Sequence, residues 1–405
     1  MINVPNKTFC ILPWLSLEAT PAGTMRVCCQ ADGEITDNTG EKFHCNTASF
    51  EQVQNSDFMR NLRQQFLDGR KPQLCRRCWN EERAGRDSKR MITLQKLNGL
   101  EDNEVWTQDT KPLVFLDLKL GNICNLKCRV CNPFSSSQLA TEEIQFAPQE
   151  EKKQTWGYTM LRAGAWPREA PQFWQQIDQC IDQVRWIEFT GGEPFLIQEH
   201  FDLLQRMVDR GIANKVHIHY NTNGTQMPQR GLDIWRHFQT VEIAVSIDGI
   251  GSSFEYQRSN AVWDEVQQNV AEFNKMRDTV SSIQTQVCST ISIFNILETP
   301  QISHWIEQQN FDYVHWNLIH DPWYFNTQCL PDNVKSAITQ QLQNADIAPR
   351  HKNEIMRIVE FMNGGASTDG FMTRMKIADL DRKRNQNFAD INPQMAQLLN
   401  YEFTG

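Results

Sequence analysis

Cysteine is the residue type that stands out for its chemistry in this chain of 405 residues. The twelve cysteines lie at positions 10, 28, 29, 45, 75, 78, 124, 128, 131, 180, 288 and 329. A chain of this length can bury a large core without disulfide bonds, and it opens with no charged and then apolar leader. We therefore expect reduced thiols that bind a metal or act in catalysis, rather than structural disulfides.

Three of the cysteines form a C-x3-C-x2-C loop directly after an expected strand. They are Cys124, Cys128 and Cys131. Three thiolates on a short loop can hold three irons of a cubane cluster and leave the fourth iron without a protein ligand. An open metal position of this kind accepts a small ligand. A closed zinc site, the structural alternative, requires a fourth ligand, and no histidine lies near the loop. The loop therefore predicts an open [4Fe–4S] cluster.

A second set of cysteines precedes residue 80. A C-x2-C pair and two distant cysteines have the composition of a closed four-thiolate site, for either an iron–sulfur cluster or zinc. The expected ligands are Cys10, Cys28, Cys75 and Cys78. Cys28 and Cys29 are both possible second ligands, and the spacing favours Cys28. Cys29 and Cys45 are then spare thiols, unless Cys45 replaces one of the four.

The remaining composition is that of an ordinary globular protein. Hydrophobic residues make up 40% and charged residues 22%, which excludes a disordered chain, a collagen and a coiled coil. The apolar runs 113–116 and 241–245 are too short to cross a bilayer, so we expect a cytoplasmic protein with no membrane partner. The 40 Lys and Arg against 49 Asp and Glu give a net charge of −9, which argues against a general nucleic-acid binder.

Short β-rich runs alternate with helical periodicity from about residue 110 onward. Strands are expected over 113–120, 185–190, 215–221, 241–247, 284–293 and 313–319. Helices are expected over 171–183, 198–211, 228–238, 261–277 and 299–309. This alternation indicates right-handed βα units and a parallel sheet, hence the α/β class. A closed or partial barrel and an open doubly wound sheet both fit the pattern.

The change of pattern along the chain suggests three domains. Residues 1–100 form a small amino-terminal domain that includes an amphipathic helix over 49–67, which an Asp-Gly pair ends. Residues 110–325 form the barrel, with an insertion over 134–170. Residues 326–405 form a polar, helical carboxy-terminal extension.

The cysteine loop and the residues at the later strand ends together resemble the radical S-adenosylmethionine (SAM) superfamily. Strands end in TGGEP at 190–194, NTNG at 221–224 and SIDG at 246–249, and an arginine follows at 258. The resemblance covers about residues 113–320 and implies a partial (β/α)6, TIM-like barrel. The residues that it assigns to SAM binding are Gly191, Gly192, Glu193, Asn223, Ser246, Asp248 and Arg258.

The same resemblance implies a reaction. The loop cysteines would hold a catalytic [4Fe–4S] cluster whose open iron binds SAM. A low-potential donor such as a flavodoxin or ferredoxin would reduce the cluster, and one electron would cleave SAM. The resulting 5′-deoxyadenosyl radical would abstract a hydrogen atom from the substrate, while the protein orients the ligand and excludes water.

The amino-terminal segment resembles the twitch module, a shortened relative of the SPASM domain that carries an auxiliary cluster. The matching residues, in chain order, are Phe9, Cys10, Pro13, Trp14, Gly23, Cys28, Cys29, Cys75, Cys78, Trp79, Glu82, Gly85, Ser88 and Arg90. Such modules usually follow the barrel, and here the module precedes it, as in a group of radical SAM proteins with an N-terminal twitch domain. The resemblance implies an auxiliary [4Fe–4S] cluster that aids electron transfer.

The resemblance implies more than one class of substrate. Relatives with SPASM or twitch modules often modify peptides, so a peptide or protein residue is the first expectation. A small metabolite, such as a sugar or an antibiotic precursor, is the second. An alternative of another class is a non-catalytic iron–sulfur electron carrier or scaffold, which would produce no 5′-deoxyadenosine.

Several further polar side chains on the expected strands can face a barrel interior. They are Glu188, His217, His219, Cys288, His315 and Asn317. Packing inside the barrel is the default interpretation for the histidines and for Cys288. A substrate-facing acid, base or thiol is the alternative.

Overall fold

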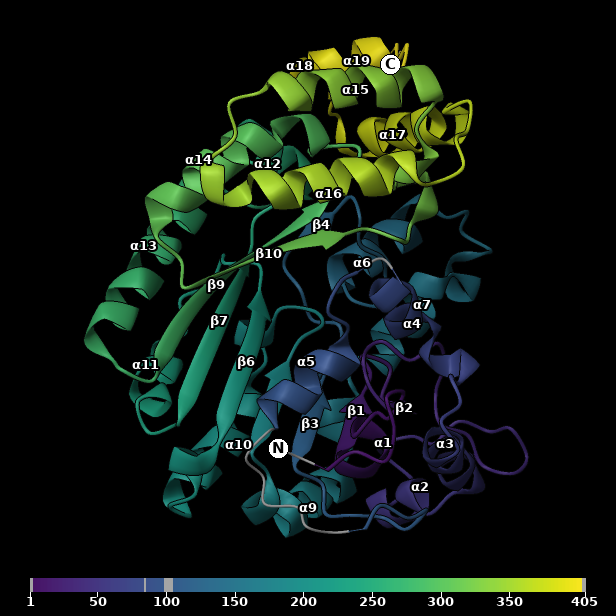
Figure 1. Ribbon diagram of the computed structural model, residues 1–405, viewed down its shortest axis with the longest axis vertical. Coiled ribbons are helices and arrows are strands. Elements are labelled where there is room, and N and C mark those ends of the chain that lie inside the picture. The colour runs from purple at the N-terminus through teal and green to yellow at the C-terminus, as the bar shows by residue number, and fades with distance from the viewer. Residues whose placement is uncertain (1–2, 84, 98–104, 403–405) are drawn as a thin grey trace. The chain divides into compact units, whose positions relative to one another are not determined.

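The computed structural model of the chain describes residues 3–83, 85–97 and 105–402, and it divides into two compact units, which we describe separately (Figure 1). The first unit comprises Met1–Ile123, Thr159–Tyr220 and His237–Thr240. The second unit comprises Cys124–Tyr158, Asn221–Arg236 and Val241–Gly405. The predicted domain boundary at residue 100 lies outside the described residues.

The strands of the first unit lie side by side in the order β6-β5-β3-β1-β2 (Figure 1). Their bounds are β1 Ser16–Ala19, β2 Met25–Arg26, β3 Phe115–Leu118, β5 Trp186–Phe189 and β6 His217–Thr222, whose first four residues belong to this unit. All neighbouring pairs are parallel except β1 with β2. The helices of this unit are α1 Leu12–Leu15, α2 Phe50–Gln54, α3 Asp57–Leu67, α4 Arg76–Arg83, α5 Lys89–Lys96, α8 Trp166–Glu169, α9 Pro171–Cys180, α10 Gln198–Asp209 and α7 Trp156–Ala163, whose last five residues belong to this unit.

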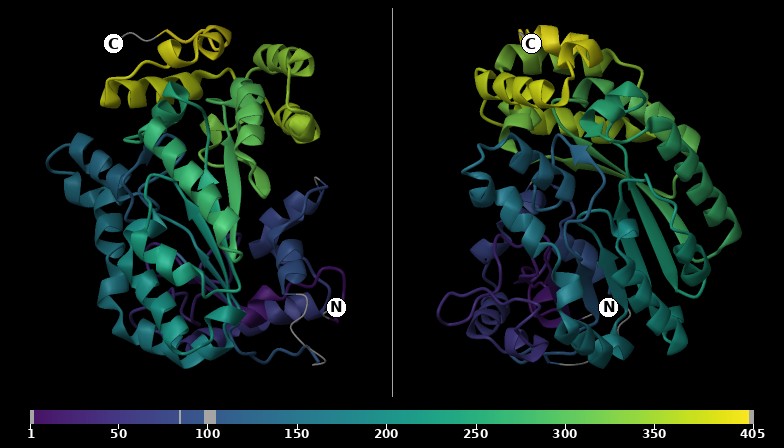
Figure 2. Two further views of the ribbon diagram at one scale, coloured as in Figure 1. Left: turned by 90° about the vertical axis from the view of Figure 1, so that its left-hand side faces the viewer. Right: turned by 180° about the vertical axis from the view of Figure 1, so that it is seen from behind.

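The second unit holds the strands in the order β10-β9-β7 and a separate antiparallel pair, β4 with β8. Their bounds are β4 Lys127–Cys128, β8 Arg258–Ser259, β9 Ile283–Ile291, β10 Tyr313–Leu318 and β7 Thr240–Ser246, whose first residue belongs to the first unit. The helices are α6 Ser137–Phe146, α11 Gln229–Trp235, α12 Ser252–Gln257, α13 Trp263–Thr279, α14 Thr299–Gln309, α15 Asp332–Asn344, α16 Lys352–Asn363, α17 Phe371–Arg384, α18 Phe388–Ile391 and α19 Pro393–Leu398. Helices α15 to α19 lie together, as both views of Figure 2 show.

The α/β class and the six strands expected after residue 110 are confirmed, each within a few residues of its expected bounds. Along β6 and β9, buried residues alternate with half-buried polar ones. This period of two places the polar side chains on one face of the strands, as β geometry requires. His217 and His219 therefore share a face, as expected.

Two features of the sequence were misjudged. The helix expected over 49–67 is two helices, because Ser49 and Ser56 each accept a backbone N–H bond and each begin a new helix. Strands β1, β2, β4 and β8 were not anticipated, since they are only two to four residues long. Among them, β1 is fully buried and extends the parallel strands of the first unit beside β3.

No helix in the described ranges combines the length and the apolar character needed to cross a membrane.

Candidate functional site

The loop with the three cysteines is held in shape by serines that follow it. Ser136 Oγ donates to the carbonyl of Leu126 at 2.7 Å, and the Cys124 N–H donates to Ser137 Oγ at 3.2 Å. The Cys131 N–H turns back onto the carbonyl of Cys128. Ser136 also begins α6 as its N-cap. The loop is therefore fixed at both ends, and its three thiols are half-buried.

Charge around these thiols favours a bound cationic group. Burial raises the pKa of Cys128 and raises that of Cys131 to about 12, and the neighbouring thiols raise the pKa of Cys131 further. The thiols ionise only when positive charge offsets this cost, and cluster iron supplies such charge. Three converging thiols with a half-buried opening fit the open cluster predicted from the sequence.

Asn223 lies next to the first cysteine of the loop. Its Nδ2 donates to Asn125 Oδ1 at 2.9 Å and lies 4.0 Å from Cys124 Sγ. Its Oδ1 accepts from the N–H of Thr225 at 2.9 Å. Gly224 follows with a positive φ of 77°, and a Cβ there would meet Val245 at 2.8 Å. The segment 222–225 therefore requires glycine and presents an amide at the thiol.

Arg258 lies against the second cysteine. Because β8 pairs with β4, Arg258 lies opposite Cys128, and Nη1 is 3.9 Å from the sulfur. Asp248 accepts from Arg258 Nη2 at 2.6 Å and from the N–H of Thr290 at 2.8 Å. Asp248 is buried and both of its carboxylate oxygens have protein partners. Ser246 lies nearby in sequence, half-buried and in register with Cys288.

Gly191, Gly192 and Glu193 belong to the first unit and follow β5. Gly191 and Gly192 have positive φ angles of 72° and 53°. A Cβ on Gly192 would collide with the carbonyl oxygen of Ile123, and the N–H of Glu193 donates to that same oxygen at 2.7 Å. Ile123 immediately precedes Cys124, so this turn is tied to the residue at which the cysteine loop begins. Only glycine permits the approach.

The carboxy-terminal helices hold the loop from within the second unit, which sequence reasoning missed. Arg129 donates to Asp381 of α17 at 2.7 Å, and both side chains are fully buried. Asp381 also accepts from Tyr256, Tyr401 and the N–H of Phe388 at 2.8 to 2.9 Å. Arg129 and Asp381 are 252 positions apart in the sequence, so no local pattern predicts their contact.

The four amino-terminal cysteines expected to form a closed site line one cavity of the first unit. The cavity is lined by Cys10, Leu12, Pro13, Val27, Cys28, Gln30, Ala31, Phe66, Cys75, Cys78 and Arg90. Burial raises the pKa of each of the four thiols, and in three of them nearby thiols raise it further. Four thiols in an apolar cavity fit a closed metal centre, whose positive charge would allow them to ionise.

The structure separates Cys28 from the two other nearby thiols. Cys28 lines the cavity, whereas Cys29 lies with Asp117 and Glu188. Cys45 is buried, and burial is the first cause that raises its pKa, with no other thiol among the causes. Of these three thiols only Cys28 lines the cavity, and its role as a ligand stays a prediction.

Arg90 is the charged member of the cavity wall. Its guanidinium donates twice to Glu82, at 3.0 and 2.8 Å, and once to the carbonyl of Phe9 at 2.9 Å. It also lies over the ring of Trp79. Ser88 donates to Glu82 at 2.7 Å and caps α5. Arg90 thus contacts Phe9, which precedes Cys10, and Trp79, which follows Cys78. These contacts explain why Phe9, Trp79 and Arg90 occur together with the cysteines.

No protein-family model and no curated protein sequence matches the chain. Several solved structures align with it at low similarity. A structure of anSMEcpe with bound AdoMet has 15% identity, a TM-score of 0.38, and 57% of this chain and 58% of that chain covered. Streptococcus suis SuiB bound to the precursor peptide SuiA has 13% identity, a TM-score of 0.33, and 79% and 64% covered.

A third alignment is with TsrM from Kitasatospora setae, a radical S-adenosylmethionine methyltransferase with tryptophan and a SAM analogue bound. It has 9% identity, a TM-score of 0.37, and 71% and 66% of the two chains covered. The chain therefore spans less than two thirds of each of these three proteins. At such TM-scores the alignments carry no conclusion about activity.

Proposed function

We propose that the protein is a radical SAM enzyme that carries a catalytic [4Fe–4S] cluster on Cys124, Cys128 and Cys131. The observation that carries this proposal is the half-buried C-x3-C-x2-C loop, with Asn223 at one thiol and Arg258 at another. When bound, the cluster and SAM supply a 5′-deoxyadenosyl radical through one-electron cleavage of the sulfonium. All other steps depend on how the chain binds and orients these groups.

The chain's own residues then have distinct roles. The turn at Gly191 and Gly192 would let backbone approach the SAM methionine, and Glu193 would accept from its amino group. Asn223 would orient the loop and contact the adenosine side of SAM. Arg258 provides positive charge beside Cys128, and Asp248 holds Arg258 in place. Ser246 contributes a half-buried hydroxyl at the end of β7.

We also assign an auxiliary cluster to Cys10, Cys28, Cys75 and Cys78, in a domain of the twitch type. The shared cavity and its apolar lining support a closed site in which protein thiols ligate every iron. A closed cluster has no position for substrate, so its role is to transfer an electron, for instance away from an oxidised substrate. Zinc is the alternative occupant of the same four thiols.

The preferred substrate is a residue of a peptide or protein, and the second candidate is a small metabolite such as a sugar or an antibiotic precursor. The enzyme would act in the cytoplasm with a flavodoxin or ferredoxin as its electron donor. A non-catalytic electron carrier would share both thiol sites but would cleave no SAM. That difference provides the test.

The test uses the full chain after anaerobic reconstitution, with SAM and a low-potential reductant. Replacing all three loop cysteines (Cys124→Ala, Cys128→Ala and Cys131→Ala) should abolish the formation of 5′-deoxyadenosine, whereas Cys180→Ala, a change on α9 of the first unit, should leave it intact. Iron per chain should fall from about eight to about four. Continued SAM cleavage in the triple variant, or none in the wild-type chain, would refute the proposal.

A further inference from the structure

Five titratable side chains form one cross-strand row in the first unit. Through the strand register, Arg26 of β2 lies opposite Glu18 of β1, Glu18 opposite Asp117 of β3, Asp117 opposite Glu188 of β5, and Glu188 opposite His219 of β6. Directly opposite residues project to the same face of a sheet. The sequence motifs did not account for this row.

The two outer acids of the row each accept a hydrogen bond from a cation. Glu18 Oε1 accepts from Arg26 at 2.5 Å and from Lys119, while its Oε2 has no hydrogen-bond partner among the described residues. These two cations hold the pKa of Glu18 below its usual value, even though burial alone would raise it. Glu188 is paired with Lys89. Burial opposes ionisation here too, but Lys89 outweighs it and lowers the pKa of Glu188 to about 2.

Asp117, between them, is not satisfied in this way. It is only 1% exposed, and neither carboxylate oxygen has a hydrogen-bond partner among the described residues. The nearest cation is Lys119, whose Nζ lies 3.6 Å from Oδ1. Burial raises the pKa of Asp117, and the charges of Glu18 and Glu188 raise it further, although the charge of Lys119 lowers it in part. A buried carboxyl group without a hydrogen bond is costly, so its presence indicates a partner that is not part of the chain.

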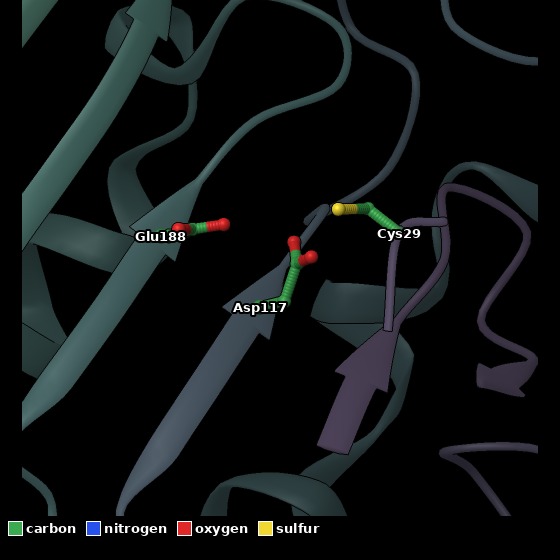
Figure 3. A group of neighbouring side chains, drawn as sticks. All are labelled: Cys29, Asp117 and Glu188. Carbon is green, nitrogen blue, oxygen red and sulfur yellow. The ribbon is translucent and has the colours of Figure 1, made fainter. Parts of the chain in front are cut away.

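Cys29 and Glu188 converge on this carboxyl group. The Cys29 sulfur and carboxylate oxygens of Asp117 and Glu188 lie within 4.8 Å of one another, and Figure 3 shows the three side chains pointing toward a common centre. Cys29 is half-buried, whereas the two acids are buried. The centre is thus a small polar site, and its least buried member is the cysteine.

The charges of the site select the class of ligand. The three cations Arg26, Lys89 and Lys119 already balance the formal charge of the three acids Glu18, Asp117 and Glu188, although none of them donates a hydrogen bond to Asp117. A divalent metal or an ammonium group would add positive charge next to two lysines. A neutral hydroxyl group adds none, and it can donate to the carboxylate while its oxygen accepts from Lys119.

We propose that Asp117, flanked by Cys29, Glu188 and Lys119, binds a hydroxyl group of the substrate. The inference deepens the proposed function, on which it rests, because it names a hydroxyl-bearing residue or metabolite as the substrate class. Asp117 is then a binding residue rather than a structural one. Both predictions that follow can be measured without SAM cleavage, so their failure is distinct from failure of the proposed function.

The first measurement compares two buried carboxylates that face each other across β1 and β3. In the reconstituted full chain without substrate, Asp117→Asn should raise the thermal unfolding midpoint at pH 7 to 8, because a buried carboxyl group without a hydrogen bond is removed. Glu18→Gln, the matched control, should lower the midpoint because it breaks two ion pairs. A lower midpoint for Asp117→Asn would mean that a structural partner holds Asp117, and would overturn the proposal.

The second measurement tests the ligand by equilibrium dialysis of two neutral probes, N-acetyl-L-serinamide and N-acetyl-L-alaninamide, which differ only in the hydroxyl group. The wild-type chain should bind the serine probe about tenfold more tightly, as expected for one hydrogen bond to a charged group. Asp117→Asn should lose most of this preference. Equal binding of the two probes by the wild-type chain would overturn the proposal. So would a stoichiometric extra metal, beyond cluster iron, that Asp117→Asn removes.

Discussion

The two thiol sites differ in what surrounds the sulfur atoms. The amino-terminal cavity gathers four thiols among apolar side chains, with one arginine whose charge Glu82 largely neutralises. The loop site gathers three half-buried thiols beside an amide and an arginine. The first environment suits a cluster in which protein thiols ligate every iron and which only exchanges electrons. The second suits a cluster with a free iron and polar groups that orient a small ligand.

The largest effect is expected from removing expected ligands of the amino-terminal four-cysteine site. Cys75→Ala with Cys78→Ala should eliminate the amino-terminal cluster and reduce iron from about eight to about four per chain. SAM cleavage without substrate should persist, because the loop cysteines are untouched. Iron analysis and electron paramagnetic resonance of the reduced protein measure this. If this variant also lost the signal of the loop cluster, the two sites would not be independent.

The second prediction concerns the support of the loop site. Asp381→Ala leaves the fully buried Arg129 without its ion-pair partner and removes three further hydrogen bonds. We expect a loss of about 3 to 5 kcal/mol in unfolding free energy. Occupancy of the loop cluster should fall more than that of the amino-terminal cluster. Denaturant unfolding and spectroscopic quantification of each cluster would check this, and equal losses at both sites would show that Asp381 serves only general stability.

The third prediction concerns the turn after β5. It separates the cost of a positive φ from the cost of a collision between an added Cβ and the neighbouring backbone. Gly192→Ala combines a positive φ of 53° with a collision against the Ile123 carbonyl. Gly211→Ala, the matched control, has a φ of 69° and no atom within 4 Å of the added Cβ. The control should cost only about 1 to 2 kcal/mol of stability. Gly192→Ala should in addition weaken SAM binding by about tenfold, measured by equilibrium dialysis. Unchanged SAM affinity would exclude the turn from the SAM site.

The smallest effect is expected from changing the charge beside the amino-terminal four-cysteine site, which should shift the reduction potential of its cluster. Arg90→Gln leaves the Glu82 carboxylate unpaired near the four thiols and should lower the reduction potential of the amino-terminal cluster. Glu82→Gln leaves the Arg90 charge unopposed and should raise it. Potentiometric titration followed by electron paramagnetic resonance measures both. Shifts in the same direction would indicate that the pair supports the fold of the cavity and does not act through charge.

Local pattern identified much of this molecule. The cysteine spacings, the glycine-rich strand ends and the alternation of strands with helices are short-range signals, and the six strands after residue 110 occur where these signals placed them. The break of the 49–67 helix was missed because a cap at Ser56 competes with an unbroken apolar stripe. Strand β1 was missed because it is four residues long and buried on both faces, so it shows no alternation.

Sequence alone determined which residue types are available and at what spacing: three thiols on one loop, a second set with a C-x2-C pair, and glycines where the backbone turns with positive φ. Tertiary structure decided which distant groups meet. It placed Cys28 rather than Cys29 in the cavity that Cys10, Cys75 and Cys78 line, joined Arg129 to Asp381, and aligned Glu18, Asp117 and Glu188 in one row. Spacing constrains neighbours along the chain, whereas register and packing are set by the burial of whole strands and helices. A carboxyl group that lacks a hydrogen-bond partner is therefore visible only in the folded protein.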